Sequence, residues 1–250
     1  MQDIVLQVLL FFYHNLAFNN LGITIIEISV LLRLAFWPLQ KQQTHYSQKM
    51  KQLQPHLSVL KDKHKNDKQA YATAQMALMK DHGVNPAAGC LPSLVQIGML
   101  ILLMGALTKL LGMQINTSFL IWNMAKPDSY QIAGIPFAIP GILVIIAAAT
   151  QYVQTKMMMP QAPKVRKEDK KPEKEEKQDF MESFAEAQGQ MIWMFPLMFL
   201  FLGTQWPAGL ALYWSVSSIL SIAQQWYMTR GLPAVVPVLP VVSNKKKKRT

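Results

Sequence analysis

The chain has 250 residues, of which 51% are hydrophobic and only 16% are charged, and its formal net charge is +11. This share of charge is low for a soluble domain of this size. The apolar residues also occur in blocks, so the composition argues against a soluble globular domain and favours an integral membrane protein. The single cysteine, Cys90, excludes an intramolecular disulfide framework.

The first segment, residues 1–20, predicts an amphipathic helix that lies in the membrane interface. Asp3, Gln7 and His14 fall near one helical face, and the opposite side is apolar. A secretory signal peptide is the alternative reading. The segment lacks a basic start and a clear small-residue cleavage site, which weighs against that alternative.

Apolar segments at five places are candidates for crossing a bilayer. We expect spans at 21–39, 91–112, 135–156, 191–206 and 208–229. The fourth would be only about 24 Å long at ~1.5 Å per residue. It therefore needs a thin bilayer or an extension into the residues before it.

The connecting segments predict the orientation of the chain. Basic residues number eight in 41–83, seven in 158–190 and six after 229, whereas the other side holds Lys126 and a helix-end Lys109. The positive-inside rule then places the hairpin segment 40–88, the charged loop 157–190 and the basic tail 230–250 in the cytoplasm. The N-terminus and the loop 113–134 would lie outside.

A helical hairpin is predicted for residues 40–88. The apolar seam of its first helix is Met50, Leu53, Leu57 and Leu60. Asn66 or Asp67 is placed to cap the second helix, and Gly83 is placed to end it. Pro55, inside the first helix, predicts a kink.

Arg33 is the most unusual residue of the first candidate span, because a permanent charge there is surrounded by apolar residues. An arginine at the centre of a lone helix in lipid costs from roughly 2.5 to over 10 kcal/mol. One reading is that Arg33 snorkels to the cytoplasmic surface, since it lies near Pro38. The functional reading is that it faces a water-filled groove and offers an anion a fixed partner. Glu27 does not share its helical face.

Further polar side chains inside the candidate spans could line the same space, although such residues at helix contacts are usually structural. They are Gln96, Thr150, Gln151, Gln154, Ser215, Ser217, Ser218, Ser221, Gln224 and Gln225. No constellation of catalytic or metal-binding residues is evident, and no glycine-rich phosphate loop is present. We therefore expect a protein that is not an enzyme and that uses no cofactor or metal.

Four blocks of the sequence resemble the YidC/Oxa/Alb family of membrane-protein insertases. They are LLRLAFWPLQKQQTHYSQKMKQLQP (31–55), GVNPAAGCLPSLVQIGMLILL (83–103), FPLMFLFLGTQWPAGLALYW (195–214) and SSILSIAQQWYM (217–228). The resemblance covers nearly the whole chain, in order and spacing. The large extracytoplasmic domain and the extra N-terminal span of Gram-negative members have no counterpart here, so the resemblance is to a short form. A bacterial plasma membrane is the expected location, and an organellar source stays open.

The resemblance implies an all-α polytopic fold. Its parts would be five transmembrane helices around a hydrophilic groove, an N-terminal interfacial helix and a cytoplasmic hairpin. It also implies groove roles for Arg33, Tyr213 and Trp214, with Gln151 as the best match for a polar residue of the third span. Together with the intramembrane polar residues, the expected substrate groove is Arg33, Gln96, Gln151, Gln154, Tyr213, Trp214 and Ser217.

The function implied is insertion of nascent membrane proteins without nucleotide hydrolysis. Arg33 would attract a short acidic tail, and partitioning of ~20 apolar residues would supply the driving force. Ribosomal RNA is one expected partner of the tail residues Lys245, Lys246, Lys247, Lys248 and Arg249; anionic lipid or simple topology setting are the alternatives. An assembly chaperone beside a Sec-type translocon also stays open. A solute transporter or channel is less favoured, because no internal repeat is visible.

Overall fold

The computed structural model describes residues 2–64, 67–84, 87–113, 115–132, 134, 136–158 and 193–230. The expected charged loop and the basic cluster at 245–249 lie outside these residues. The helices are α1 (Gln2–Asn15), α2 (Leu21–Ala35), α3 (Trp37–Lys63), α4 (Lys68–Asp81), α5 (Ala87–Leu111), α6 (Ile142–Met158), α8 (Ala208–Thr229) and an apolar helix at Trp193–Leu202. The all-α character predicted for the chain is confirmed.

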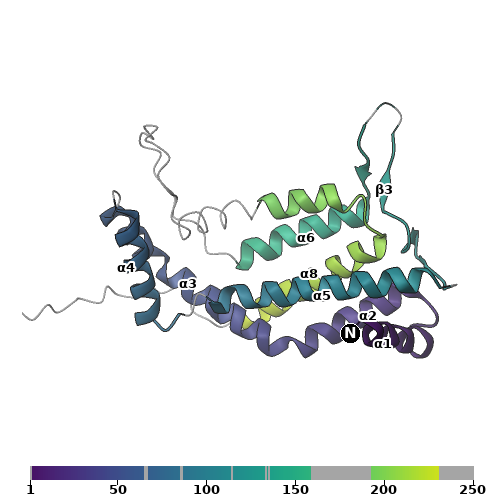
Figure 1. Ribbon diagram of the computed structural model, residues 1–250, viewed down its shortest axis with the longest axis horizontal. Helices are drawn as coiled ribbons and strands as arrows, with labels where there is room; N and C mark the ends of the chain where they lie inside the picture. The colour runs from purple at the N-terminus through teal and green to yellow at the C-terminus, as the bar shows by residue number, and fades with distance from the viewer. Residues whose placement is uncertain are drawn as a thin grey trace, which may run out of the picture.

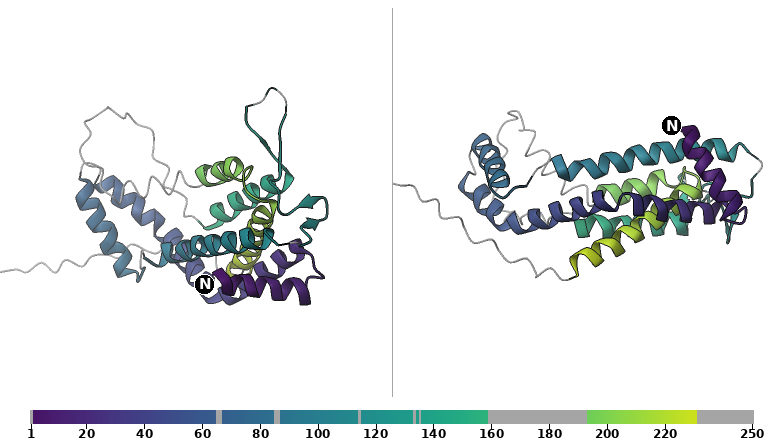
Figure 2. Two further views of the ribbon diagram at one scale, coloured as in Figure 1. Left: turned by 45° about the vertical axis from the view of Figure 1, so that its right-hand side comes forward. Right: turned by 90° about the horizontal axis from the view of Figure 1, so that it is seen from below.

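The helices are arranged as an elongated bundle (Figures 1 and 2). One end of the bundle carries the α3–α4 hairpin, and the other end carries α1 and the short strands. Helix α8 packs against α6 on one side and against α2 on the other, and α1 packs against α5 and α2. The largest apolar core joins α1, α2, α5, α6 and α8 through buried side chains such as Leu9, Ile25 and Leu210.

Within the described ranges, no single helix is both long enough and apolar enough to cross a bilayer. Helices α2 and α3 together have the length and composition to do so, as a pair bent by 65°.

The bend between α2 and α3 corrects the predicted end of the first apolar segment. We expected one continuous segment to residue 39, but α2 ends at Ala35 and α3 begins at Trp37, with Phe36 between them. Pro38 lies in the first turn of α3, where its missing N–H removes no helical hydrogen bond. Pro38 therefore lies at the start of α3 and is not the end of the first apolar segment.

The start of α6 also differs from the prediction. The segment expected from residue 135 begins as helix only at Ile142. The residues before it form strand β4 (Ile139–Pro140), which pairs with β3 (Ser129–Tyr130) in an antiparallel ribbon. A second ribbon joins β1 (Ser118–Phe119) to β2 (Trp122–Asn123). Pro140 and Gly141 disfavour helix at these positions, and the pairing with β3 uses the backbone groups instead.

The hairpin of α3 and α4 confirms the predicted caps. The Asp67 carboxylate accepts a hydrogen bond of 2.9 Å from the backbone N–H of Ala70. At the other end Gly83 has a φ of +62°, and Val84 N–H donates to the Met79 carbonyl at 2.8 Å. This is the glycine-ended Schellman arrangement. Leu53 and Leu57 are buried against Met79 and Val84, so the predicted seam is the core of the hairpin.

Three side chains fix the C-terminal end of α6 to its neighbours. Ser47 of α3 donates to the Met158 carbonyl, and the Lys51 ammonium donates to the Met157 carbonyl at 2.5 Å. Gln225 of α8 donates to the same Met157 carbonyl at 3.0 Å. These bonds satisfy carbonyls that a helix end leaves without partners, and they connect the base of the hairpin to the bundle.

Candidate functional site: a polar cavity around Arg33

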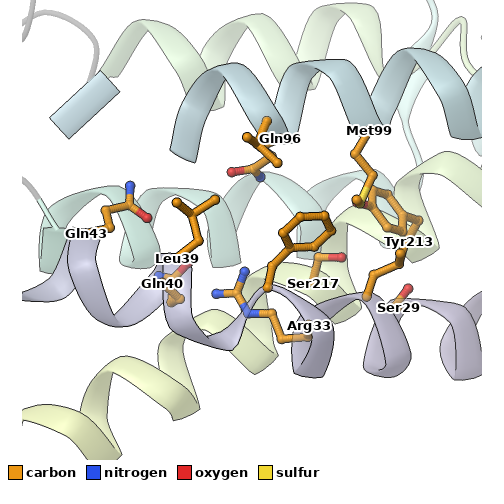
Figure 3. A pocket seen from close by; sticks show the side chains of 12 residues that line it. Ser29, Arg33, Leu39, Gln40, Gln43, Gln96, Met99, Tyr213 and Ser217 are labelled. Carbon is orange, nitrogen blue, oxygen red and sulfur yellow. The ribbon is translucent and has the colours of Figure 1, made fainter. Parts of the chain in front are cut away.

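A partly open cavity lies between α2, α3, α5 and α8 (Figure 3). Its polar lining consists of Ser29, Arg33, Gln40, Gln43, Gln96, Tyr213 and Ser217, and its apolar lining of Leu32, Phe36, Leu39, Val95 and Met99. The volume is about 60 Å³. One water molecule requires roughly 10–15 Å³ measured in this way, so the cavity has room for several.

Arg33 supplies the positive charge of this cavity. Figure 3 shows its guanidinium extending from α2 into the space that Gln96 of α5 enters from the opposite side. Two of its nitrogens, Nε and Nη2, are buried and have no hydrogen-bond partner within the described residues. The side-chain nitrogen of Gln40, Nε2, is also buried and has no hydrogen-bond partner among the described residues. A buried donor without a partner is costly, so these groups favour a ligand or water that accepts hydrogen bonds.

The helical repeat explains how the sequence brings these residues together. Ser29 and Arg33 are four residues apart on α2, and Tyr213 and Ser217 are four apart on α8, so each pair occupies one face. Tyr213 interacts with Ser217 and with the charge of Arg33. Gln40 of α3 lies seven residues after Arg33 and extends the polar lining of the cavity beyond the bend at Phe36.

The structure therefore brings together four of the predicted groove residues: Arg33, Gln96, Tyr213 and Ser217. Gln40 and Gln43 were missed, although the interval of seven from Arg33 to Gln40 was visible in the sequence. They were missed because the first span was taken to end at residue 39. Ser29 was missed as well. Its hydroxyl donates to the Ile25 carbonyl at 2.6 Å, so it is a partnered member of the lining.

The other three predicted groove residues are placed differently: Gln151 of α6 and Trp214 of α8 are paired with each other, and Gln154 is a buried residue of α6. All three are buried, and none of them lines the cavity of Arg33. Trp214 follows Tyr213 by one residue, which is a rotation of ~100° around the helix. Its indole donates a hydrogen bond of 2.7 Å to Gln151 Oε1 of α6. It clusters with Ala147 of α6 and with Phe199 of the helix Trp193–Leu202.

The side chains that line the cavity are suited to binding a ligand. They offer a fixed guanidinium, amide groups that both donate and accept, and apolar walls. In the part of the chain that is described, no three His, Cys, Asp or Glu side chains come together as a metal site would require. Among the described residues, the Oε2 atom of the acidic Glu27 of α2 is also buried without a partner, so Glu27 does not pair with Arg33 through that atom.

The fold and the site together define a class of protein: an apolar helical bundle with a polar, positively charged cavity between its helices. Comparison with known proteins gives the family. The model of the family described as 60Kd inner membrane protein matches residues 11–234. The chain belongs to this family, which is the YidC/Oxa/Alb family that its motifs predicted, and the membership supports a location in a membrane.

Curated proteins that carry the name membrane protein insertase YidC are similar to the chain over most of its length. One from Pelobacter propionicus is 32% identical over 230 residues, which is 90% of this chain and 38% of that protein. One from Geotalea uraniireducens is 34% identical over 232 residues, covering 92% of this chain and 37% of the relative. One from Cupriavidus pinatubonensis is 34% identical over 216 residues, covering 86% and 33%. The chain thus spans about a third of the length of these relatives.

Proposed function

We propose that the chain is a membrane-protein insertase that moves short polar tails of nascent membrane proteins across the bilayer through the cavity of Arg33. The observation that carries this proposal is the half-buried cation of Arg33. Two of its nitrogens, Nε and Nη2, are buried without a partner among the described residues, in a cavity large enough for water. A permanent charge in an apolar bundle is expensive unless water or a group of opposite charge solvates it. The name and function of the relatives, membrane protein insertase, agree with this use.

The proposed first step is capture of the tail. A short acidic tail that approaches from the cytoplasm meets the guanidinium of Arg33, which neutralises its charge. Gln40, Gln43 and Gln96 offer hydrogen bonds to its peptide groups in place of water. The cavity thereby shortens the path that a polar segment must cover through hydrocarbon.

The proposed second step is release into lipid. The apolar segment that follows the tail meets Leu32, Phe36, Leu39, Val95 and Met99 on the walls of the cavity. Transfer of ~20 apolar residues into the bilayer is favourable and supplies the driving force without a nucleotide. The tail is then released on the outer side, because its bonds to Arg33 are weaker than the gain from burying the apolar segment.

The α3–α4 hairpin is proposed as the cytoplasmic receiver of the substrate. It is attached to the bundle by Ser47 and Lys51, next to the part of α3 that carries Gln40 and Gln43. The basic residues 245–249 would add contacts to the ribosome or to anionic lipid. In this topology the N-terminus lies outside and the C-terminus in the cytoplasm, as the distribution of basic residues predicts.

The test uses the purified chain in liposomes with a single-span substrate that carries a short acidic tail. Protease is added outside the vesicles after the substrate has been offered from that side. Protection of the tail in vesicles that contain the chain, and digestion in empty vesicles, is the expected result. Digestion in both would contradict insertion by this chain alone and would favour an assembly chaperone that acts beside a translocon.

A further inference from the structure

The ribbon of β3 and β4 has one apolar face. Tyr130 pairs with Ile139, and Ser129 pairs with Pro140. Tyr130 and Ile139 are a directly opposed pair, so their side chains lie on the same face of the ribbon. Ile132 and Phe137 lie beyond the paired residues toward the tip. Tyr130, Ile132 and Phe137 are 55%, 48% and 61% exposed, so no other part of the described chain covers these apolar side chains fully.

The base of the ribbon is held firmly by the ends of two helices. Asp128 is buried, and its carboxylate accepts a hydrogen bond of 2.7 Å from Leu143 N–H at the start of α6. Gly141 N–H donates to the Asp128 carbonyl at 2.8 Å. Pro127 forms a bridge with Pro207, and Ala208 N–H at the start of α8 donates to the Lys126 carbonyl at 2.8 Å. The helix ends therefore set the direction in which the ribbon leaves the bundle.

That direction is sideways. Figure 1 shows the ribbon leaving the end of the bundle across the direction of the helices and extending past α6, on the side away from α1. The neighbouring surface of α6 is apolar, with Ile142 and Ile145 exposed. No charged residue occurs from Ser129 to Thr155. The ribbon therefore continues the apolar outer surface of α6 beyond the edge of the bundle.

We propose that this ribbon is a membrane anchor whose apolar face enters the outer leaflet at the boundary between headgroups and acyl chains. The proposal rests on the membrane location contained in the proposed function. Aromatic side chains such as Tyr130 and Phe137 suit this boundary, and an uncharged ribbon meets no charge penalty there. Helix α1 lies on the opposite side of the same end of the bundle (Figure 1). The two elements would brace the outer ends of the helices from opposite sides.

Site-directed spin labelling of the full chain in liposomes tests this anchor. Cys90 is the only cysteine, so a Cys90→Ser background accepts single labels at Ile132→Cys and Phe137→Cys. Ala138→Cys is the matched control, because Ala138 is next to Phe137 in the chain and is less exposed. Collision of each label with oxygen, which concentrates in lipid, is compared with collision with a water-soluble nickel complex.

We expect the labels at 132 and 137 to collide with oxygen and to be shielded from nickel, and the label at 138 to be open to nickel. Three labels that are all open to nickel would overturn the proposal. Labels at 132 and 137 that are shielded from both reagents would also overturn it, since a protein would then cover the face. A label at Ile145→Cys separates the two proposals. If it faces lipid while the ribbon is in water, the anchor fails and the membrane location of the bundle stands; if it is open to nickel, the membrane location fails.

Discussion

The indole N–H of Trp214 donates a hydrogen bond of 2.7 Å to the side-chain oxygen of Gln151, and this bond joins α8 to α6 in a buried, apolar setting. Ser218 lies 3.4 Å from the same oxygen, and the amide nitrogen of Gln151 donates to Thr155 at 3.2 Å. Each polar atom of the Gln151 side chain therefore has a partner. The pair has the properties of a structural connection between two helices, and it lies outside the cavity of Arg33.

A double-mutant cycle on this pair is predicted to show coupling. Trp214→Phe or Gln151→Leu alone leaves a buried polar group without its main partner, which costs about 1–3 kcal/mol of unfolding free energy. The double variant should lose less than the sum of the two, by about 0.5–2 kcal/mol. The measurement is denaturant unfolding in bicelles. Additive losses would show that the bond contributes nothing specific.

Insertion activity separates this structural role from a groove role for Trp214. We expect Trp214→Phe to insert substrate as well as the parent chain does per folded molecule, because Phe keeps the packing against Phe199 and Ala147. Ser218→Ala is the matched control for stability, since its bond to Gln151 is long. A loss of insertion in fully folded Trp214→Phe would return this residue to the substrate path.

The contact between α1 and α5 is predicted to weaken in acid. Lys109 Nζ lies 2.7 Å from Asp3 Oδ1, and its hydrogen bond and charge hold the pKa of Asp3 below its ordinary value. A lowered folded-state pKa means that the stabilisation is present above the unfolded value of about 3.9 and is lost as the pH falls through the folded value. The effect is small, because both side chains are exposed.

Amide hydrogen exchange in α1 measures this loss as a function of pH. In the parent chain, protection of α1 relative to α6 should fall below about pH 4. Asp3→Asn, the control, removes the titrating group and should make that ratio independent of pH. An equal fall in the Asn variant would assign the acid effect to another group.

Two glycine substitutions are predicted to act with opposite signs. A Cβ at Gly141 would lie 2.2 Å from the Asp128 carboxylate, so Gly141→Ala must displace the group that caps α6. Loss of such a cap costs about 1 kcal/mol, with up to ~2 kcal/mol observed. At Gly98 of α5, no atom of the described residues lies within 4 Å of an added Cβ. Gly98→Ala should raise the unfolding free energy by about 0.5–1 kcal/mol through helix propensity. Equal effects in unfolding experiments would contradict this account of Gly141.

The end of α4 offers a test of the hairpin. Gly83 has a φ of +62°, a conformation that costs L-residues with a Cβ about 1–2 kcal/mol. Gly83→Ala should therefore loosen the Met79–Val84 contact and speed amide exchange at the end of α4. Gly83→Asn is the control, because Asn tolerates this conformation. Unchanged exchange in the Ala variant would show that the cap does not hold the helix end.

The sequence predicted those features that depend on residues within one helical turn, and it did not predict those that depend on tertiary packing. Asp67 and Gly83 were predicted as cap residues because capping depends on residue type within one turn. The break at Phe36 was not predicted, because Pro38 is compatible both with the end of one helix and with the first turn of another. The choice between them depends on the neighbours of α3, which no local pattern reveals. The β3–β4 ribbon was missed for a related reason, since its paired strands contain only two residues each.

The candidate site was predicted only in part, because tertiary packing decides which of the polar residues line the cavity. The charge of Arg33 and the polar character of Gln96 and Ser217 inside apolar segments identified these residues, and the resemblance added Tyr213. The structure brings all four together. Trp214 was suggested as a groove residue by the resemblance alone, and Gln151 by the resemblance and by its polar side chain in an apolar segment. Which side of α8 faces α2 and which faces α6 is set by tertiary packing, and Trp214 lies on the α6 side. The groove roles of all these residues remain predictions.

The measurement that tests the central claim most directly is protease protection of a translocated tail with three forms of residue 33 and two forms of the substrate. The parent chain, Arg33→Lys and Arg33→Ala are each placed in liposomes. The substrates carry either an acidic tail or the same tail with its acids changed to amides. Positive charge without a specific shape should be enough, so the parent and the Lys variant should protect the acidic tail and the Ala variant should not. With the uncharged tail, the three forms should be much closer. Equal protection of the acidic tail by Arg33→Ala would contradict the account and would leave Arg33 as a side chain that only reaches toward the membrane surface.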